Sequence, residues 1–166
     1  QGGPTDMRLV ATWDFRDDPP DPQVGIIDMS FDKGQSLAEW MVEVGGSTTL
    51  GELEVREPQR TLATIDASRA QRWITIEPDG EELVQYFSFN TPVGVPDDQL
   101  CGRVVYSDIH VSSGDEEGAD FPDGCVTDGL TAQEKVLLYM MFDLASCLVP
   151  EEPTCTPTTC EALALD

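Results

Sequence analysis

The segment Arg103–Val111 (RVVYSDIHV) constrains the fold most, because its first half carries apolar residues on both faces. A strand with one solvent-facing side alternates apolar and polar residues, whereas a strand that is covered on both sides does not. The pattern therefore predicts a central strand with structure packed on each side. An acidic loop follows it, and then a helix that starts near Ala132. This order predicts an α/β fold with a layered sheet and flanking helices.

The helix after the acidic loop has clear start and stop signals. Thr131 and Glu134 have the spacing of a capping box, in which each side chain bonds the backbone N–H of the other residue. Pro150 stops the helix. Apolar residues at helical spacing predict its buried stripe, which comprises Leu137, Met140, Met141, Leu144 and Leu148.

An earlier helix is predicted by the same kinds of signal. Asp32 and Gln35 fit a second capping box, and Gly45 is placed to end the helix. The residues expected to face the core are Leu37, Trp40, Met41 and Val44.

The middle of the chain is rich in strand patterns. Asp79-Gly80 is a hairpin signal between two of these patterns. We expect these strands to form a β-rich insertion in the α/β fold. With a first strand at the N-terminus, the expected strands are Leu9–Trp13, Leu53–Val55, Thr61–Ile65, Trp73–Ile76 and Leu83–Phe89.

The length of 166 residues suits one domain with one core. Apolar residues make up 40% of the chain, which separates it from disordered acidic segments. We assign residues 1–149 to the α/β domain. Residues 150–166 have no core pattern, and we assign them to a linker and the start of a Cys-rich tail.

The formal net charge of -23 excludes some classes of partner. It repels the phosphates of nucleic acids and the headgroups of anionic membranes, whereas cationic partners and divalent metals are compatible with it. No apolar run approaches the ~20 residues that span a bilayer, so we expect no transmembrane segment. The N-terminus, QGGPTDMRLV, has no signal-peptide pattern, and we expect a mature or excised piece of a longer protein.

Five cysteines suit an oxidising compartment. The strand starts just after Cys101, and the helix must return along it, so the helix end at Cys147 comes back beside Cys101. The lengths agree roughly, at about 30 Å for the strand and about 22 Å for the helix. We therefore predict a Cys101–Cys147 disulfide. Cys125 would lie at the opposite end of the strand and needs a partner outside this chain.

Several segments together resemble one family. CGRVVYSDIHVSSG, FPDGC and LTAQEKVLLYMMFDLASC resemble the C-terminal end of a domain in large extracellular proteins of gliding, predatory bacteria. GIIDMSFDKGQSLAEWMVEVG, QRWITI and VQYFSFNTPVG look like the same family, so the resemblance covers nearly residues 10–149. PTCTPTTCEALALD is similar to the opening of a Cys-rich repeat that often follows such domains.

The resemblance implies a fold, a location and a partner. The chain would be the C-terminal part of a flavodoxin-like, class I glutamine-amidotransferase-like domain, in a secreted or cell-surface protein. Its expected partner is the missing N-terminal half of that domain, or another surface protein. The repeat stops here after two cysteines, so Cys155 and Cys160 pair with each other or with the truncated repeat.

His110, the only histidine, lies at the C-terminal end of the expected strand, where the sites of α/β sheets gather. Amidotransferase-like enzymes also place a histidine after a late strand, but their pattern has a glutamate two residues on, where this chain has Ser112. No nucleophile elbow occurs in the chain. Asp108 shares a strand face with His110 and is the other candidate. We expect a structural or exposed histidine; a catalytic role would fall to His110 and Asp108.

The acidic loop is the candidate metal site. Calcium takes about six to eight oxygen ligands from a folded loop, and glycines permit the sharp turns that such a loop needs. The spacing differs from that of an EF-hand, so we expect a solvated loop. A calcium site there would use Asp115, Glu116, Glu117, Asp120 and Asp123.

These observations favour a secreted or cell-surface, non-catalytic binding or structural module without a cofactor. Two alternatives stay open. One is a hydrolase or amidotransferase-like enzyme that uses His110 with a nucleophile outside this chain. The other is a calcium-stabilised adhesion domain.

Overall fold

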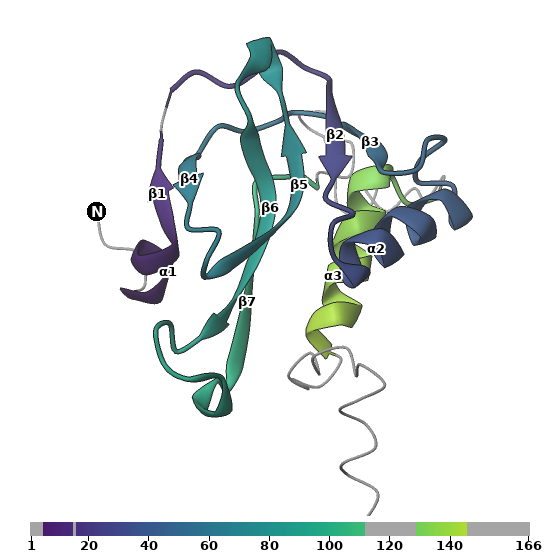
Figure 1. Cartoon of the computed structure of the whole chain (residues 1–166). Coiled ribbons are helices and arrows are strands. Elements are labelled where there is room, and N and C mark those ends of the chain that lie inside the picture. The colour runs from purple at the N-terminus through teal and green to yellow at the C-terminus, as the bar shows by residue number, and fades with distance from the viewer. Residues whose placement is uncertain (1–4, 15, 112–128, 146–166) are drawn as a thin grey trace, which may run out of the picture.

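A five-stranded antiparallel sheet lies at the centre of the computed structural model, which describes residues 5–14, 16–111 and 129–145. The strands are ordered β3-β2-β5-β6-β7, and each neighbouring pair is antiparallel (Figure 1). Their bounds are Gln23–Ile27 for β2, Glu52–Val55 for β3, Ala70–Ile76 for β5, Leu83–Thr91 for β6 and Gly102–Ser107 for β7.

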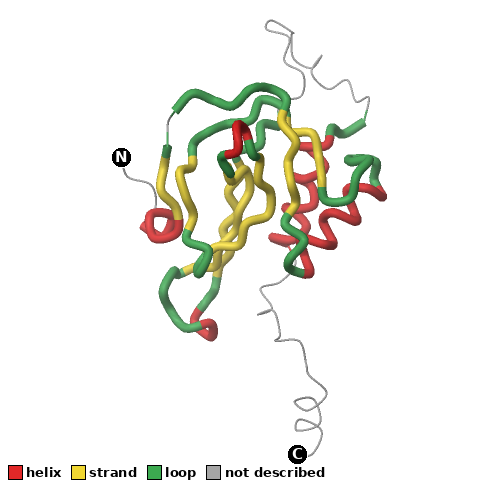
Figure 2. Tube along the Cα trace, turned by 45° about the horizontal axis from the view of Figure 1, so that its top comes forward, coloured by secondary structure: helices red, strands yellow, loops and turns green. Residues whose placement is uncertain are grey.

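Two layers cover this sheet, one on each face. On one face lie two helices, α2 (Asp32–Glu43) and α3 (Ala132–Ala145). On the other face lies a two-stranded antiparallel sheet of β1 (Ala11–Trp13) and β4 (Leu62–Ile65), which the short helix α1 (Thr5–Val10) precedes (Figure 2). The five-stranded sheet is therefore the middle layer of three.

Each face of the middle sheet has its own hydrophobic core. The core under the helices includes Leu37, Met41, Trp73, Val136 and Met140. The core under the two-stranded sheet includes Val10, Leu62, Val84, Phe87 and Phe89. Residues of β6 contribute to both cores, which explains why nearly the whole strand is buried.

The mixed α/β class predicted from the sequence is confirmed. The β-rich middle is not an insertion, however, because β5 pairs with β6 and β6 pairs with β7 in one sheet. All the described strand pairs are antiparallel, whereas the strands of a flavodoxin-like sheet are mostly parallel. The domain boundary predicted between residues 149 and 150 lies outside the described residues and stays a prediction.

β7 lies at an edge of the described sheet, which corrects the expectation of a central strand. It pairs with β6 and with no other strand in the described part of the chain. Val104 and Tyr106 pack into one core and Val105 packs into the other. Apolar residues on both faces therefore reflect the layers above and below the strand, and not its place within the sheet.

Most of the predicted element ends are confirmed. The Thr131 hydroxyl accepts from the Glu134 N–H (3.2 Å), and the Glu134 carboxylate accepts from the Thr131 N–H (2.7 Å), so this capping box forms in full. Gly45 has a φ of 65° just after α2, where a left-handed residue closes a helix. Asp79 and Gly80 also have positive φ, 56° and 79°, in the 3-10 turn η1 (Pro78–Gly80) between β5 and β6.

Other local predictions are wrong. The first turn of α2 has no side-chain cap, since Phe31 is its N-cap and Gln35 donates to Glu39. Leu9 belongs to α1 rather than to a strand. The sequence pattern does not predict β2, because its exposed positions carry Val24 and Ile26 and polar alternation is missing.

Gln133, near the start of α3, connects three parts of the chain. Its side-chain oxygen accepts from the Arg56 N–H (2.8 Å), and its side-chain nitrogen donates to the Arg56 carbonyl (3.1 Å) and to the His110 carbonyl. Arg56 follows β3 and His110 lies beyond β7, so one buried side chain joins both edge strands to the helix. The amide thus satisfies backbone groups that no neighbouring strand pairs with.

We expect Gln133→Ala to lower the free energy of unfolding by about 3 kcal/mol, because buried backbone groups lose their hydrogen-bond partner. Urea denaturation measures the change. Gln35→Ala is the matched control, since Gln35 is exposed and bonds only Glu39 in the described structure; we expect a change within about 0.5 kcal/mol. Equal losses for the two variants would contradict this role of Gln133.

β7 and α3 run in opposite directions across the sheet. Gln133 at the start of the helix contacts His110, beyond the end of the strand. Arg103 at the start of the strand lies 3.6 Å from Asp143 near the end of the helix. The prediction of a Cys101–Cys147 disulfide depends on this antiparallel arrangement of β7 and α3. Cys101 is exposed, and Cys147 lies outside the described residues, so the disulfide itself stays a prediction.

Non-reducing peptide mapping of the oxidised protein is expected to recover Cys101 and Cys147 in one linked peptide, because the helix end returns to the start of β7. Reduction should separate the two halves. A peptide that links Cys101 to Cys125 would contradict the prediction, since Cys125 belongs to the segment that follows the other end of β7.

Candidate binding surface

The last ten residues of α3 are apolar except for one charge that points inward. Between Val136 and Ala145, the only charged residue is Asp143. Its side chain is 7% exposed, and it forms ion pairs with Lys33 of α2 (2.7 Å) and with Arg103 of β7 (3.6 Å). A surface helix usually turns its charged residues to solvent, so this arrangement is the reverse of the common one.

The sheet provides the cation that holds Asp143. The Arg103 guanidinium donates to the Ser88 hydroxyl (3.0 Å) and lies 5.9 Å from the centre of the Trp73 ring. Trp73 donates to the same hydroxyl (2.8 Å). Because these contacts fix Arg103 beneath α3, the carboxylate of Asp143 must face the sheet to neutralise it.

The residues that flank Asp143 on the helix are apolar and exposed. Met141, Phe142 and Leu144 are 56%, 66% and 45% exposed, and we call them the outer face of α3. The predicted buried stripe is therefore partly wrong. Met140 is buried, but Met141 and Leu144 face outward, while Leu148 lies outside the described residues. The buried stripe contains Gln133, Val136, Met140 and Asp143 instead.

Aromatic packing holds α3 against α2. The Tyr139 ring lies 5.5 Å from the Trp40 ring and 6.4 Å from the Trp73 ring, measured between centroids. The Tyr139 hydroxyl donates to the Lys33 carbonyl (3.2 Å), and burial raises the pKa of this tyrosine. The outer face of α3 is therefore carried by a helix that is held along its length.

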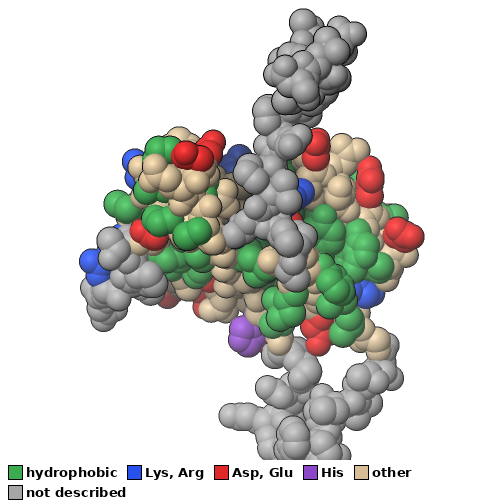
Figure 3. Space-filling model, turned by 90° about the horizontal axis from the view of Figure 1, so that it is seen from below, with side chains coloured by type: hydrophobic (Ala, Val, Ile, Leu, Met, Phe, Trp, Pro, Cys, Tyr) green, Lys and Arg blue, Asp and Glu red, His purple; other side chains and the backbone are tan. Residues whose placement is uncertain are grey.

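Viewed from below, apolar side chains gather over the helical side of the molecule (Figure 3). Elsewhere on the helical side, Val42 of α2 and Leu130 just before α3 are also exposed. Single exposed apolar residues are normal on a protein surface, whereas grouped ones mark contact sites. The grouping on and around α3 makes this surface the candidate site.

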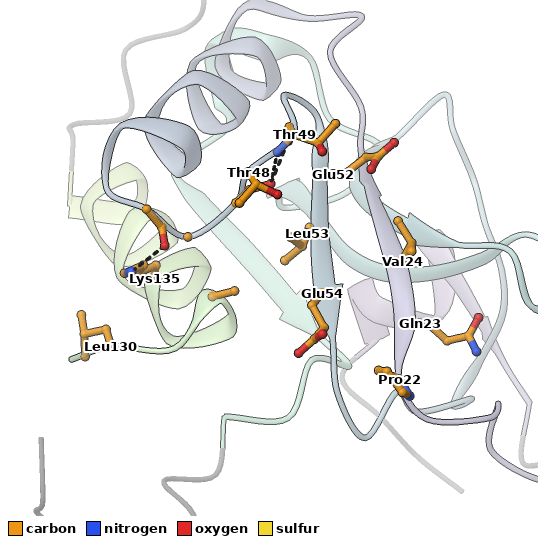
Figure 4. Close-up of a pocket in the computed structure, with 14 residues that line it drawn as sticks. Pro22, Gln23, Val24, Thr48, Thr49, Glu52, Leu53, Glu54, Leu130 and Lys135 are labelled. Atoms are coloured by element: carbon orange, nitrogen blue, oxygen red, sulfur yellow. Dashed lines mark hydrogen bonds between the residues drawn. The ribbon is translucent and has the colours of Figure 1, made fainter. Parts of the chain in front are cut away.

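A groove of about 490 Å³ lies between the start of α3 and β3 (Figure 4). Lys135 closes one end by donating to the Gly45 carbonyl (3.2 Å). Ser47 and Thr49 bond each other across the tight turn that forms its rim. Two carboxylates from β3, Glu52 and Glu54, also line it, but no histidine or cysteine does. The groove can accept polar or cationic side chains.

His110 is an exposed residue with one carboxylate partner. Its Nδ1 lies 2.7 Å from Glu57 Oε2, and the two side chains are 57% and 58% exposed. Glu57 has a positive φ of 50°, and its N–H donates to the Asp21 carboxylate (2.9 Å). An ion pair this exposed adds at most about 1 kcal/mol to stability.

Asp108 has a different environment from His110. It is buried and accepts hydrogen bonds from the N–H and hydroxyl of Thr61 and from the Tyr106 hydroxyl (2.9 Å). Burial raises the pKa of Tyr106 to about 12, so this phenol stays protonated and donates at neutral pH. The prediction that Asp108 and His110 share a strand face is wrong, because β7 ends at Ser107 and its alternation stops there. Asp108 connects the end of β7 to the start of β4.

The remaining candidate residues cannot be placed in this surface. The loop carboxylates proposed for calcium lie outside the described residues, as do Cys125, Cys155 and Cys160, so the calcium site and the Cys155–Cys160 pair stay predictions. Within residues 5–14, 16–111 and 129–145, no group of three metal-ligating side chains occurs. No helix in these ranges has the length and apolar character to cross a bilayer; α3, with 14 residues, is about 21 Å long.

Comparison with known proteins found no matching family model, no similar curated protein and no similar solved structure. The sequence reasoning missed the outward direction of Met141 and Leu144. One signal could have found it: the run VLLYMMFDLA is apolar nearly all round, which is typical of a helix covered on more than one side.

Proposed function

We propose that this domain is a non-catalytic binding module of a secreted or cell-surface protein, and that it binds through the outer face of α3. One observation carries the proposal. The last ten residues of α3 carry one charge, Asp143, and it faces inward. The same part of the helix exposes Met141, Phe142 and Leu144 to water. Grouped exposed apolar side chains of this kind are typical of protein contact sites.

The free energy that this surface offers favours a binding role. Full burial of a Leu, Met or Phe side chain is worth about 2 kcal/mol, so covering these half-exposed residues contributes about 1 kcal/mol each. The Asp143 pairing prevents the helix from burying them within the domain. A partner that covers them therefore gains free energy that folding leaves unused.

The secreted location rests on the sequence. Five cysteines in 166 residues favour an oxidising compartment.

We propose, on the sequence resemblance, that the chain is the C-terminal part of a larger flavodoxin-like, amidotransferase-like domain. Because a flavodoxin-like sheet is mostly parallel, the larger domain would need parallel strands outside the described ranges. The outward side of β7 pairs with no described strand, and a further strand could add there.

Site-specific cross-linking tests the binding role. A photoreactive phenylalanine at position 142 should give one discrete covalent adduct in cells that make the protein, because the partner covers this residue. The same group at position 9 is the control, since Leu9 is also exposed (45%) but lies on α1, on the other side of the sheet. Equal adducts at both positions, or none at position 142, would contradict the proposal.

Serine substitutions separate binding from folding in this experiment. Met141→Ser should abolish the adduct at position 142 while the free energy of unfolding changes by no more than about 0.5 kcal/mol. The neighbouring Met140→Ser should cost about 3 kcal/mol or more, because Met140 is 1% exposed. Urea denaturation measures both values.

A specific observation favours one alternative, a hydrolase or amidotransferase-like enzyme. The Glu57 carboxylate bonds the Nδ1 of His110, as carboxylates do when they orient a catalytic imidazole. The pair lies in water, however, and the hydrogen bonds of Asp108 go to Thr61 and Tyr106. This function therefore requires the nucleophile and the walls of the site from outside the described residues.

We expect His110→Gln to leave the free energy of unfolding within about 1 kcal/mol of the parent value, because the pair with Glu57 is exposed. Turnover by the full protein on a panel of amide and ester substrates should be unchanged. A loss of more than about a hundredfold in turnover, with folding intact, would favour the enzyme, since this is the scale of a general base.

A further inference from the structure

Carboxylates lie on α3 and on its neighbour α2. Glu134 lies seven residues before Met141, so the two share a side of the helix. On α2, which packs beside α3 through Trp40 and Tyr139, the exposed acidic residues are Asp32, Glu39 and Glu43.

Each of the two described lysines of these helices bonds another group of the domain. Lys33 is paired with Asp143 beneath the helix (2.7 Å). Lys135 donates to the Gly45 carbonyl (3.2 Å) at the rim of the groove. The charges on this pair of helices are therefore mostly negative, within a chain whose net charge is -23.

We infer that the partner at this face is an amphipathic basic helix of another protein. This inference rests on the proposed binding role and adds the chemistry of the partner. Its apolar stripe covers Met141, Phe142 and Leu144, and its lysines or arginines lie against Glu134 and the carboxylates of α2. Helix-in-groove recognition combines the same two elements, apolar anchors and complementary charged flanks.

Charge selects this occupant over a second copy of the chain. Two copies in contact would bring their carboxylates together, and like charges at close range are destabilising. A basic helix removes that repulsion and replaces it with attraction. The distance from Glu134 to the outer face sets the size of the partner: Glu134 to Leu144 is ten residues, about 15 Å, which corresponds to about three turns of helix.

Three synthetic peptides of about 14 residues test the inference, since a helix of about 21 Å is long enough to span these 15 Å. The first is a leucine–lysine helix with leucines at i, i+3, i+4 and i+7. The second has the same composition in scrambled order. The third keeps the leucine pattern and replaces each lysine with glutamine. Fluorescence anisotropy measures their affinity for the full chain at about 0.15 M salt, where long-range attraction is screened.

We expect the first peptide to bind at least about tenfold more tightly than either of the others, because only it matches both the apolar face and the carboxylates of these helices. Phe142→Ser should remove its advantage over the scrambled peptide. Glu39→Gln with Glu43→Gln should remove its advantage over the glutamine peptide. Leu9→Ser is the matched control and should change neither, since Leu9 is as exposed as Leu144 but lies on α1.

Four results would overturn the inference. Equal binding of the scrambled peptide would show general attraction of cations to an acidic chain. Equal binding of the glutamine peptide would show that charge does not select the partner, although the binding role would stand. No binding of the first peptide at about 1 mM would exclude a basic helix. Sedimentation that shows a dimer of the chain, dissociated by Phe142→Ser, would identify a second copy as the occupant, and the cross-linking result would still test the binding role.

Discussion

The orientation of α3 depends on one buried carboxylate. Asp143 pairs with Lys33 of α2 and Arg103 of β7 beneath the helix. Burying these charges costs desolvation free energy, and the pairing offsets that cost without adding much net stability. The pairing fixes the orientation of α3 about its own axis. An orientation that buried Met141 and Phe142 would carry Asp143 away from both cations and leave Arg103 unpaired beside the Trp73 ring. The apolar outer face is therefore the consequence of satisfying a charge inside the domain.

The same helix is held at its start and its middle by polar contacts. Gln133 joins α3 to the ends of both edge strands, and the capping box at Thr131 and Glu134 satisfies backbone groups of the first turn. Tyr139 packs between the rings of Trp40 and Trp73. A surface built on such a helix keeps its side chains in one arrangement before binding, and preorganisation of this kind lowers the entropy lost on association. A small apolar face would then be sufficient for the proposed contact site.

The strong negative charge and the apolar face are compatible parts of one surface. Net charge of one sign keeps copies of a chain apart, so an acidic protein can expose apolar residues without associating with itself. The β7 edge is open on the described side of the sheet, and repulsion between acidic chains also opposes edge-to-edge pairing. A partner with basic residues meets no such barrier. The repulsion between copies of the chain and the preference for a basic partner would then have the same electrostatic origin.

The sequence by itself determined the local elements: the capping box at Thr131, the left-handed stop at Gly45, the Asp79-Gly80 turn and the mixed α/β class all follow from residue types and short spacings. Such signals are local because they depend on backbone groups within a few residues. Only the tertiary structure decided that β7 is an edge strand of an antiparallel sheet, that Asp108 is buried while His110 is exposed, and that Met141 faces water while Asp143 does not. The physical reason is the position of Arg103. It lies about forty residues from Asp143 in sequence, and an apolar helix without a clear polar side has no local preference strong enough to oppose a buried cation.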